Sequence, residues 1–433
     1  MLIPENYEYS ISSIMSTSKK QFIVHEDWAV VILGLFTIVI TLCGFVLPVP
    51  VFNWSNSPEL FSKVLSVKNL QIILLQFIFV AIVAGVGSML TGKPIKNFLL
   101  GFPVLYLLTV IALIVAGSAA IRGLNLEAVI ISLVIGLIIS NFFKVPLWLK
   151  ESLSTELYVK VGLILLGTSV IFGDILKAGT LGLIQALIVV ITVWYFAYWV
   201  SKKLKVDDEL TMMLASAVSI CGVSAAIATS GAIKGDTKKL SYVISLVLIT
   251  AIPMMIGMPY MANALGLSQA VTGAWLGGTI DTTGAVVASG TLVGEEALKI
   301  STIVKFSQNV LLGVAAFAIS IYWSYTKHPG VGGEQVKPTL SVIWERFPKF
   351  VLGFIAASLL FSFFIQPSTI AEVKSSLKNL QGLWFTLAFT SIGLETKFSD
   401  LFKHENRKPL YAFLIAQSFN IIITLIISYF LFR

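Results

Sequence analysis

Two stretches decide how this chain is interpreted: AVSICGVSAAIATSGAI, residues 217–233, and GGTIDTTGAVVASG, residues 277–290. Both lie inside long hydrophobic segments, yet both consist largely of Gly, Ser, Thr and Ala, and the second contains a carboxylate, Asp281. Hydroxyl groups gain nothing from contact with hydrocarbon, and a charge at the bilayer centre costs about 2.5–3.5 kcal/mol. We therefore predict that both stretches face the protein interior and bind a polar ligand.

The composition identifies a membrane protein. Of the 433 residues, 57% are hydrophobic and 12% are charged, and the mean hydropathy is +0.91, which excludes a soluble globular protein. Apolar runs long enough to cross a hydrocarbon core of roughly 30 Å recur along the chain. We predict an all-α polytopic protein with about 13 transmembrane helices. They are expected near 29–49, 70–91, 98–120, 126–143, 158–176, 182–201, 210–233, 240–265, 269–293, 298–324, 348–366, 380–396 and 409–432.

The basic residues predict an orientation in the membrane. The net charge is +8, but Lys and Arg are spread over short loops, so the partner is the lipid bilayer and not nucleic acid. The positive-inside bias places the N-terminus in the cytoplasm. The basic loop 234–239 conflicts with this assignment, because the predicted order of spans puts it outside.

The chain divides into three predicted parts. Residues 1–28 form a polar N-terminal tail without a cleavable signal, since the apolar run that follows is too long for one. Residues 29–94 contain two extra N-terminal spans, which carry few polar residues and suit packing or assembly, so a homodimer is left open. Residues 95–433 contain the remaining spans, and the repeat and polar residues described below predict that they form a transporter domain.

A short internal repeat indicates inverted symmetry. TSVIFGDILK, residues 168–177, resembles TSIGLETKFSDLFK, residues 390–403, which has four extra residues in the middle. Seven predicted spans separate the two copies, so they have opposite orientations in the bilayer. Inverted repeats of this kind are typical of secondary transporters. We predict repeats of about 126–265 and 269–432; the alternative is chance similarity between apolar helices.

The first polar stretch contains a predicted backbone site. Ser219, Cys221, Gly222 and Ser224 place glycine and small polar side chains where a helix unwinds most easily, because Gly costs about 1 kcal/mol relative to Ala inside a helix. Free amides at such a break bind an anion, and free carbonyls suit a cation. The alternative is close helix packing through small residues, which requires no ligand.

The second stretch carries the charge. Asp281 is the predicted ion-coupling residue: it binds Na⁺, exchanges a proton, or pairs with Lys305. The neighbouring candidates for substrate binding are Thr279, Thr282, Thr283 and Gly284.

A third group of candidates lies in the tenth predicted span. Lys305, Gln308 and Asn309 share one helix face at spacings of three and four residues, and they form a polar stripe that suits an anion. The alternative for Lys305 is a lysine that extends to the membrane interface.

An enzyme is not expected. The sequence has no HExxH, GxSxG or P-loop motif, and no histidine is predicted at membrane depth that could act as a base for Cys221. Cys43 and Cys221 are far apart in predicted spans and imply neither a disulfide nor a cysteine metal site. No cofactor is expected apart from Na⁺ at Asp281.

At these residues the chain resembles the sulfate exporter family of bacterial inner-membrane proteins. The resemblance runs from about Leu105 to the C-terminus and rests on several blocks in the family's order. They are LILLGTSVIFGDI (163–175), SICGVSAAIA (219–228), LGGTIDTTGAVVASG (276–290), ALKISTIVKFSQNVLL (297–312) and LAFTSIGLETKF (387–398).

The resemblance implies a fold similar to the bile-acid symporters and sodium/proton antiporters. Such a fold has inverted five-helix repeats, panel and core domains, and broken crossing helices, with residues 219–224 at the first break. The chain departs from the family where it has Asp281, Thr282 and Ala285 in place of His, Glu and Gln, and Gln308 in place of Arg. Each departure removes a potential cation, which either argues against an oxyanion substrate or moves its recognition onto Lys305 and backbone amides.

The resulting expectation is a secondary active transporter. It would move a small anion, a sulfate-like oxyanion or a small organic acid, coupled to Na⁺ or H⁺ by alternating access. The alternative from a different class is a channel or a transport-fold sensor that binds a small ion without coupled turnover.

Overall fold

The computed structural model describes residues 24–123, 128–327, 344, 347–396 and 407–433. Most of the polar tail predicted for residues 1–28, and the second repeat element at 398–403, therefore lie outside the described residues. Within the described part all regular elements are helices, apart from an isolated bridge between Trp54 and Ser118. This confirms the predicted all-α class.

Several helices suit a membrane by length and composition. In the described part of the chain, six are long and apolar enough to cross a bilayer, which makes this a multi-pass membrane protein. They are α4 (Val67–Leu90), α5 (Ile95–Ala116), α10 (Phe172–Lys203), α13 (Thr237–Ala264), α16 (Glu295–Lys327) and α20 (Lys408–Phe432).

The remaining helices are shorter or carry more polar residues. They are α2 (Glu26–Leu42), α3 (Ser57–Glu59), η1 (Leu60–Val64), α6 (Ala119–Gly123), α7 (Ala128–Phe142), α8 (Leu147–Lys150), α9 (Thr155–Gly167), α11 (Asp208–Ser216), η2 (Ala217–Cys221), α12 (Val223–Ile233), α14 (Gln269–Thr279), α15 (Thr283–Val293), α18 (Phe350–Leu359), η3 (Leu360–Phe364) and α19 (Pro367–Glu395). The three η elements are single π-helical turns.

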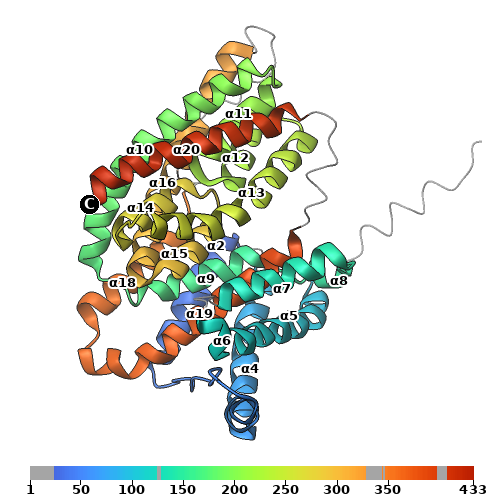
Figure 1. The fold of residues 1–433 in the computed structure, drawn as a ribbon, viewed down its shortest axis with the longest axis vertical. Helices are drawn as coiled ribbons and strands as arrows, with labels where there is room; N and C mark the ends of the chain where they lie inside the picture. The colour runs from blue at the N-terminus through green and yellow to red at the C-terminus, as the bar shows by residue number, and fades with distance from the viewer. Residues whose placement is uncertain (1–23, 124–127, 328–343, 345–346, 397–406) are drawn as a thin grey trace, which may run out of the picture.

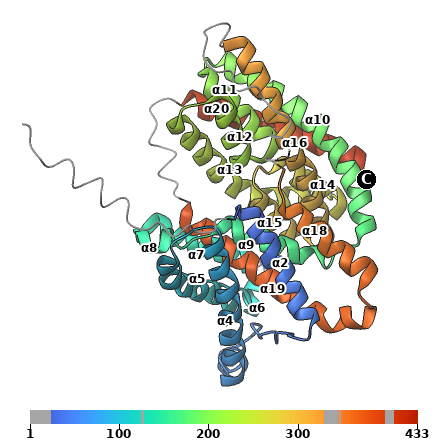
Figure 2. The same cartoon turned by 180° about the vertical axis from the view of Figure 1, so that it is seen from behind.

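The helices form two bodies (Figures 1 and 2). We call α2, α4, α5, α7, α9, α18 and α19 the scaffold, because they pack on one another around α9 and α19. We call α10, α11, η2, α12, α13, α14, α15, α16 and α20 the hairpin body. The two bodies touch mainly where α15 meets α9 and α19 and where α10 meets α18.

The segment predicted to span at 210–233 folds back on itself. Its first arm, α11 with η2, ends at Gly222, and its second arm, α12, returns to the starting level. The backbone N–H of Asp236, just after α12, donates to Glu209 Oε2 at 3.0 Å. Lys239 also donates to Asp207 Oδ1 at 2.7 Å. Both ends of this segment, which we call hairpin 1, therefore lie at the same face of the molecule.

The segment predicted to span at 269–293 is likewise a hairpin. The N–H of Ala297, in the first turn of α16, donates to Oε1 of Gln269 at the start of α14 at 3.4 Å. Both arms pack on the first turns of α16: a Cβ added to Gly273 would lie 2.7 Å from Ala297 O, and one added to Gly290 would lie 2.8 Å from Leu298 Cα. We call α14 and α15 hairpin 2. Each of these two segments is therefore a pair of short helices joined at a break, and not one continuous helix. Whether either segment crosses the membrane stays a prediction.

The two hairpins enter from opposite faces and meet at their tips. The 28-residue α13 connects the base of hairpin 1 to the base of hairpin 2 and is roughly 42 Å long at 1.5 Å per residue. A Cβ added to Gly222 would lie only 3.0 Å from the Cβ of Asp281, so the tips are in contact. The two polar stretches of the sequence thus come together inside the protein.

Contacts between helices agree with an inverted arrangement of the repeated segments. α10 and α20 run antiparallel, since Ser428 donates to Gln185 at 3.2 Å while Phe196 stacks on Phe419 at a centroid distance of 3.9 Å. α9 packs on α19, its predicted equivalent. However, hairpin 1 is the fourth element of the first predicted repeat, whereas hairpin 2 is the first element of the second predicted repeat. The repeat boundaries at 126–265 and 269–432 therefore stay predictions.

Hairpin 1 predicts a sidedness that labelling can test. In a variant without Cys43 and Cys221, we expect Lys203→Cys and Lys234→Cys to react with a membrane-impermeant thiol reagent from the same side. Leu265→Cys, at the far end of α13, should react from the opposite side. All three side chains are exposed. Labelling of positions 203 and 234 from opposite sides would mean that hairpin 1 crosses the membrane.

Candidate functional site

Gly222 creates the tip of hairpin 1. Its backbone has φ +60° and ψ −110°, a conformation that strongly favours glycine. There is also no room for a side chain, because a Cβ would lie 2.6 Å from Val247 Cγ1 and 3.0 Å from the Cβ of Asp281. The sequence therefore turns back at this glycine, and α12 begins at Val223.

The tip of hairpin 2 is a short extended segment. Ile280 and Thr282 have extended backbone, and the Thr282 hydroxyl accepts from the N–H of Ala285 at 3.3 Å, as an N-cap of α15. Asp281, between them, is 1% exposed. The break thus buries a carboxylate between two helix ends.

The first arm of each hairpin ends at its tip and leaves carbonyl groups without intrahelical partners. Side chains of α16 supply donors to them. Lys305 Nζ donates to Ile220 O at 2.9 Å and to Gln308 Oε1 at 2.8 Å. Gln308 Nε2 donates to Ser219 O at 2.9 Å and to Gly278 O at 3.2 Å, so one amide joins both hairpins.

α20 supplies further donors that the sequence analysis missed. Asn420 Nδ2 donates to Val218 O at 3.1 Å and to Thr279 O at 3.3 Å, again joining both hairpins. Gln417 Nε2 donates to Thr279 O at 3.1 Å. The available signal was the spacing of Gln417, Asn420 and Thr424, which places three polar side chains on one face of an apolar helix.

The predicted ion pair between Asp281 and Lys305 is not present. The nitrogen and oxygen atoms lie beyond the 4.0 Å limit of a salt bridge, because the Lys305 ammonium is turned to the carbonyl of Ile220 and to Gln308. The Asp281 carboxyl instead contacts the Gln417 side chain. Its Oδ2 has no hydrogen-bond partner among the described residues.

The second arms present helix N-termini to a cavity. α12 and α15 each have 11 residues, and their first N–H groups, including those of Val223, Ser224, Thr283 and Gly284, lack intrahelical partners. These residues line a cavity of about 460 Å³ between the hairpin tips and the scaffold. Two positive helix ends therefore face one cavity, which favours an anion.

The predicted site residues divide between this cavity and the interior behind it. Those that line the cavity are Cys221, Ser224, Thr282, Thr283, Gly284 and Asn309. The others do not line the cavity: Gly222 and Asp281 are buried at the contact between the two tips, and Ser219, Thr279, Lys305 and Gln308 are buried behind it. The side chain of Asn309 is 7% exposed and its Oδ1 has no partner among the described residues.

The scaffold forms the opposite wall of the cavity and carries charge. Lys160 on α9 forms ion pairs with Glu26 and Asp27, both at 3.0 Å, and with Glu156 at 3.5 Å. Glu395, at the end of α19, accepts from the Thr155 hydroxyl at 3.0 Å. This wall is predominantly acidic, so the positive contribution of the cavity comes from the hairpin body.

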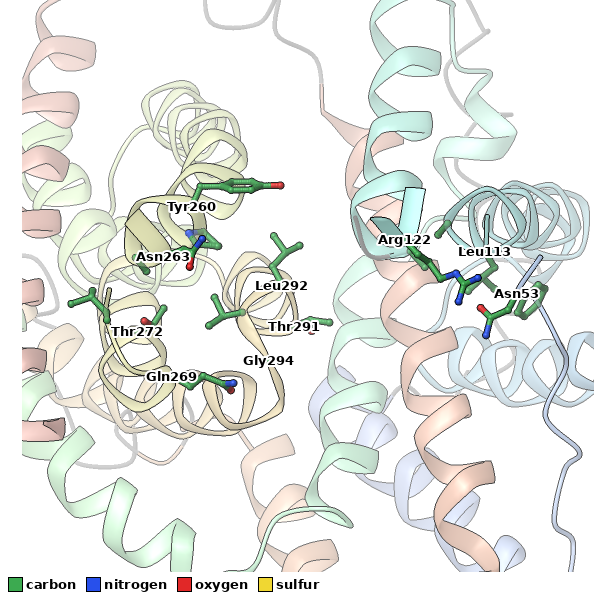
Figure 3. A pocket seen from close by; sticks show the side chains of 18 residues that line it. Asn53, Leu113, Arg122, Tyr260, Asn263, Gln269, Thr272, Thr291, Leu292 and Gly294 are labelled. Atoms are coloured by element: carbon green, nitrogen blue, oxygen red, sulfur yellow. The ribbon is translucent and has the colours of Figure 1, made fainter. Parts of the chain in front are cut away.

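A second cavity lies at the opposite face, between the base of hairpin 2 and the scaffold (Figure 3). Its volume is about 910 Å³. Gln269, Thr272 and Asn263 lie on the hairpin-body side of it, and Arg122 and Asn53 lie across from them. Hairpin 2 therefore borders one cavity with its tip and another with its base.

The described residues contain no cluster of three or more His, Cys, Asp or Glu side chains that could hold a metal ion. Cys43 and Cys221 are not bonded to each other or to another cysteine.

Asn420 should be important for stability, because it satisfies buried carbonyls of both hairpins. We expect Asn420→Leu to leave the carbonyl of Val218 without its side-chain donor and the carbonyl of Thr279 with Gln417 alone, and to lower the free energy of unfolding by about 2 kcal/mol. Ser418→Ala, at an exposed position on the same helix, should change it by less than about 0.5 kcal/mol. Denaturant or thermal unfolding of the purified variants measures both, and equal effects would show that the carbonyl contacts of Asn420 contribute little.

Comparison with known proteins places the chain in a family. The family model described as conserved hypothetical protein 698 matches residues 100–412, which is most of the chain and includes both hairpins. The chain belongs to this family. The match begins within α5, so the first two apolar helices lie outside it.

Related proteins carry the name UPF0324 membrane protein. One from Rhodopirellula baltica is 41% identical over 366 residues, which cover 82% of this chain and 67% of the relative. Another, from Nitratidesulfovibrio vulgaris, is 38% identical over 364 residues, covering 80% of this chain and 62% of the relative. The chain thus spans about two thirds of the length of these family members. No solved structure matches it.

Proposed function

We propose that this family member is a secondary active transporter that moves a small anion, a sulfate-like oxyanion or a small organic acid, by alternating access. The observation that carries this proposal is the meeting of two hairpin tips, Gly222 against Asp281, inside a multi-pass membrane protein. Irregular backbone at membrane depth is tolerated where it is buried in protein or lines a polar cavity, and transporters place their substrate sites at such breaks.

An anionic substrate is supported by the cavity at the tips. The N-termini of α12 and α15 converge there, and each contributes partial positive charge and free N–H donors. Asn309 adds a buried amide with an unpartnered oxygen, which suits a ligand that also carries a hydrogen-bond donor. A volume of about 460 Å³ accommodates a small molecule.

Alternating access is supported by the two cavities on either side of hairpin 2. Between them, a Cβ added to Gly284 would lie 3.3 Å from Ile392 Cδ1 on α19 and 3.6 Å from Val159 Cγ2 on α9. Hairpin 2 therefore packs closely on α9 and α19 near its tip, while its base borders the cavity of Figure 3. Movement of the hairpin body along the scaffold would open one cavity while closing the other.

We further propose that the N-terminal face is cytoplasmic and that the protein lies in the inner membrane. Because hairpin 1 turns back, the basic loop 234–239 lies at the same face as Lys202 and Lys203, which removes the conflict in the span order. Loops at this face then hold most of the basic residues, in agreement with the positive-inside bias.

Flux into proteoliposomes tests the proposal. Purified protein is reconstituted, and uptake of radiolabelled sulfate, a small sulfonate and a small carboxylate is followed under an imposed ion gradient. Accumulation of one of them above its equilibrium level requires a coupled carrier. Downhill flux alone would identify a channel, and thermal stabilisation by an anion without flux would identify a sensor. If only cations stabilise the protein, the anion assignment is wrong.

A further inference from the structure

The carbonyl ends of broken helices usually provide the coupling-ion site in transporters with such helices. Here those ends are occupied by the protein itself. Side-chain donors from α16 and α20 bind the carbonyl oxygens at both tips, which are those of Val218, Ser219, Ile220, Gly278 and Thr279. A Na⁺ ion at this place would have to displace these donors.

One of the donors is itself a cation. The Lys305 side chain is 1% exposed, and its ammonium is held by two oxygens, Ile220 O at 2.9 Å and Gln308 Oε1 at 2.8 Å. The carbonyl end of η2 carries partial negative charge, so a positive group is favoured there. Lys305 is too deeply buried to reach the membrane interface, which was the alternative interpretation of this lysine.

Lys305 is a buried donor with two acceptors, whereas buried side-chain acceptors around Asp281 lack donors in the described part of the chain. Asp281 Oδ2 and Gln417 Oε1 are buried without partners among the described residues, although the two side chains are in contact. An ionised carboxylate only accepts hydrogen bonds, whereas a protonated one has an O–H donor. A single proton on Asp281 would therefore supply the missing donor.

Charged groups surround Asp281 at two distances. Lys305 of α16 and Cys221 of η2 are the titratable side chains at the hairpin tips. Glu156 and Lys160 of α9 and Glu395 of α19 face the tips from across the cavity. α20 and α13 contribute the uncharged Gln417 and Met254. Ionised Asp281 and Lys305 balance each other in charge, and protonation leaves one net positive charge, which an anionic substrate would balance.

We propose that Lys305 is a fixed internal cation that takes the place of Na⁺ at the hairpin tips, and that the coupling ion is a proton bound by Asp281. The proton binds a carboxylate oxygen as one O–H bond and returns to water without any other bond changing. The coupling role rests on the proposed transport function, but the absence of a Na⁺ requirement and the protonation of Asp281 do not.

Thermal unfolding tests, without any substrate, whether Lys305 takes the place of Na⁺. The probe is NaCl titrated against choline chloride at constant ionic strength. We expect Na⁺ to shift the unfolding temperature of the wild-type protein by less than about 1 °C, because only an ion that binds the folded state stabilises it. Lys305→Ala frees the carbonyl ends and should gain a saturable stabilisation by Na⁺, whereas Lys299→Ala, on the same helix, should not. Saturable stabilisation of the wild type by Na⁺ would overturn the proposal.

Infrared difference spectroscopy tests whether Asp281 binds a proton. We expect the pH titration of the purified wild-type protein to show the C=O stretching band of a protonated carboxyl that is missing in Asp281→Asn and retained in Asp174→Asn, an exposed control. A band that is unchanged in Asp281→Asn would overturn the assignment of the proton to Asp281. A failure to observe transport would not change the Na⁺ titration or the infrared result. The transport function and the roles of Lys305 and Asp281 are therefore tested separately.

Discussion

Asp281→Asn should lower ion-driven accumulation of the substrate by about 100-fold or more, a change equivalent to roughly 2.7 kcal/mol. Asparagine keeps the size of the side chain but neither gains nor releases a proton, so the coupling step is lost. The substitution also removes a buried charge, which is costly at membrane depth, and the protein should therefore still insert and fold. Uptake into proteoliposomes under an imposed ion gradient measures the effect.

Asp174→Asn is the matched control for this substitution. It makes the same chemical change at an exposed position in the first turn of α10, and it should leave uptake within about twofold of the wild type. Normal ion-driven accumulation by Asp281→Asn would show that another residue carries the coupling ion.

Gly222→Ala should have the second large effect, on both folding and function. The alanine Cβ would lie 2.6 Å from Val247 Cγ1 and 3.0 Å from the Cβ of Asp281, and the φ of +60° with ψ of −110° is strained for any L-residue. We expect a loss of about 3 kcal/mol or more in the free energy of unfolding, or separation of the two tips with loss of uptake.

Gly257→Ala provides the comparison, because this glycine of α13 has open space around the position of a Cβ. Alanine has the higher helix propensity, so the control should be neutral or stabilised by up to about 1 kcal/mol. Unfolding midpoints and reconstituted uptake are measured for both variants. Equal behaviour of the two would mean that the tips do not require the contact at Gly222.

The membrane class and the positions of the two polar interruptions were predictable from local composition. Gly222 and Asp281 stand out because small, polar and charged residues interrupt apolar runs. A break was predicted at residues 219–224, whereas the stretch around Asp281 was predicted only to be polar and charged, and the structure shows a break there too. The direction taken after each break was not predictable. An apolar segment of about 25 residues has the length of one crossing helix, but it also has the length of two arms that each reach the middle of the membrane.

The candidate site shows the same division. The sequence identified Lys305 and Gln308 through their shared helix face, and the structure places both at the carbonyl ends of the hairpins. The sequence analysis also predicted an ion pair between Lys305 and Asp281, because opposite charges attract. The structure separates them, since the ammonium is better satisfied by fixed carbonyl oxygens, and it adds Gln417 and Asn420 from a helix more than a hundred residues away.

The sequence by itself determined that this is a helical membrane protein with two buried polar interruptions, because hydrophobicity, glycine and charge act locally along the chain. Only the tertiary structure decided that these interruptions are the tips of two opposed hairpins. That outcome depends on contacts between distant residues, such as Asp236 with Glu209 and Ala297 with Gln269, which turn each segment back to the face where it began.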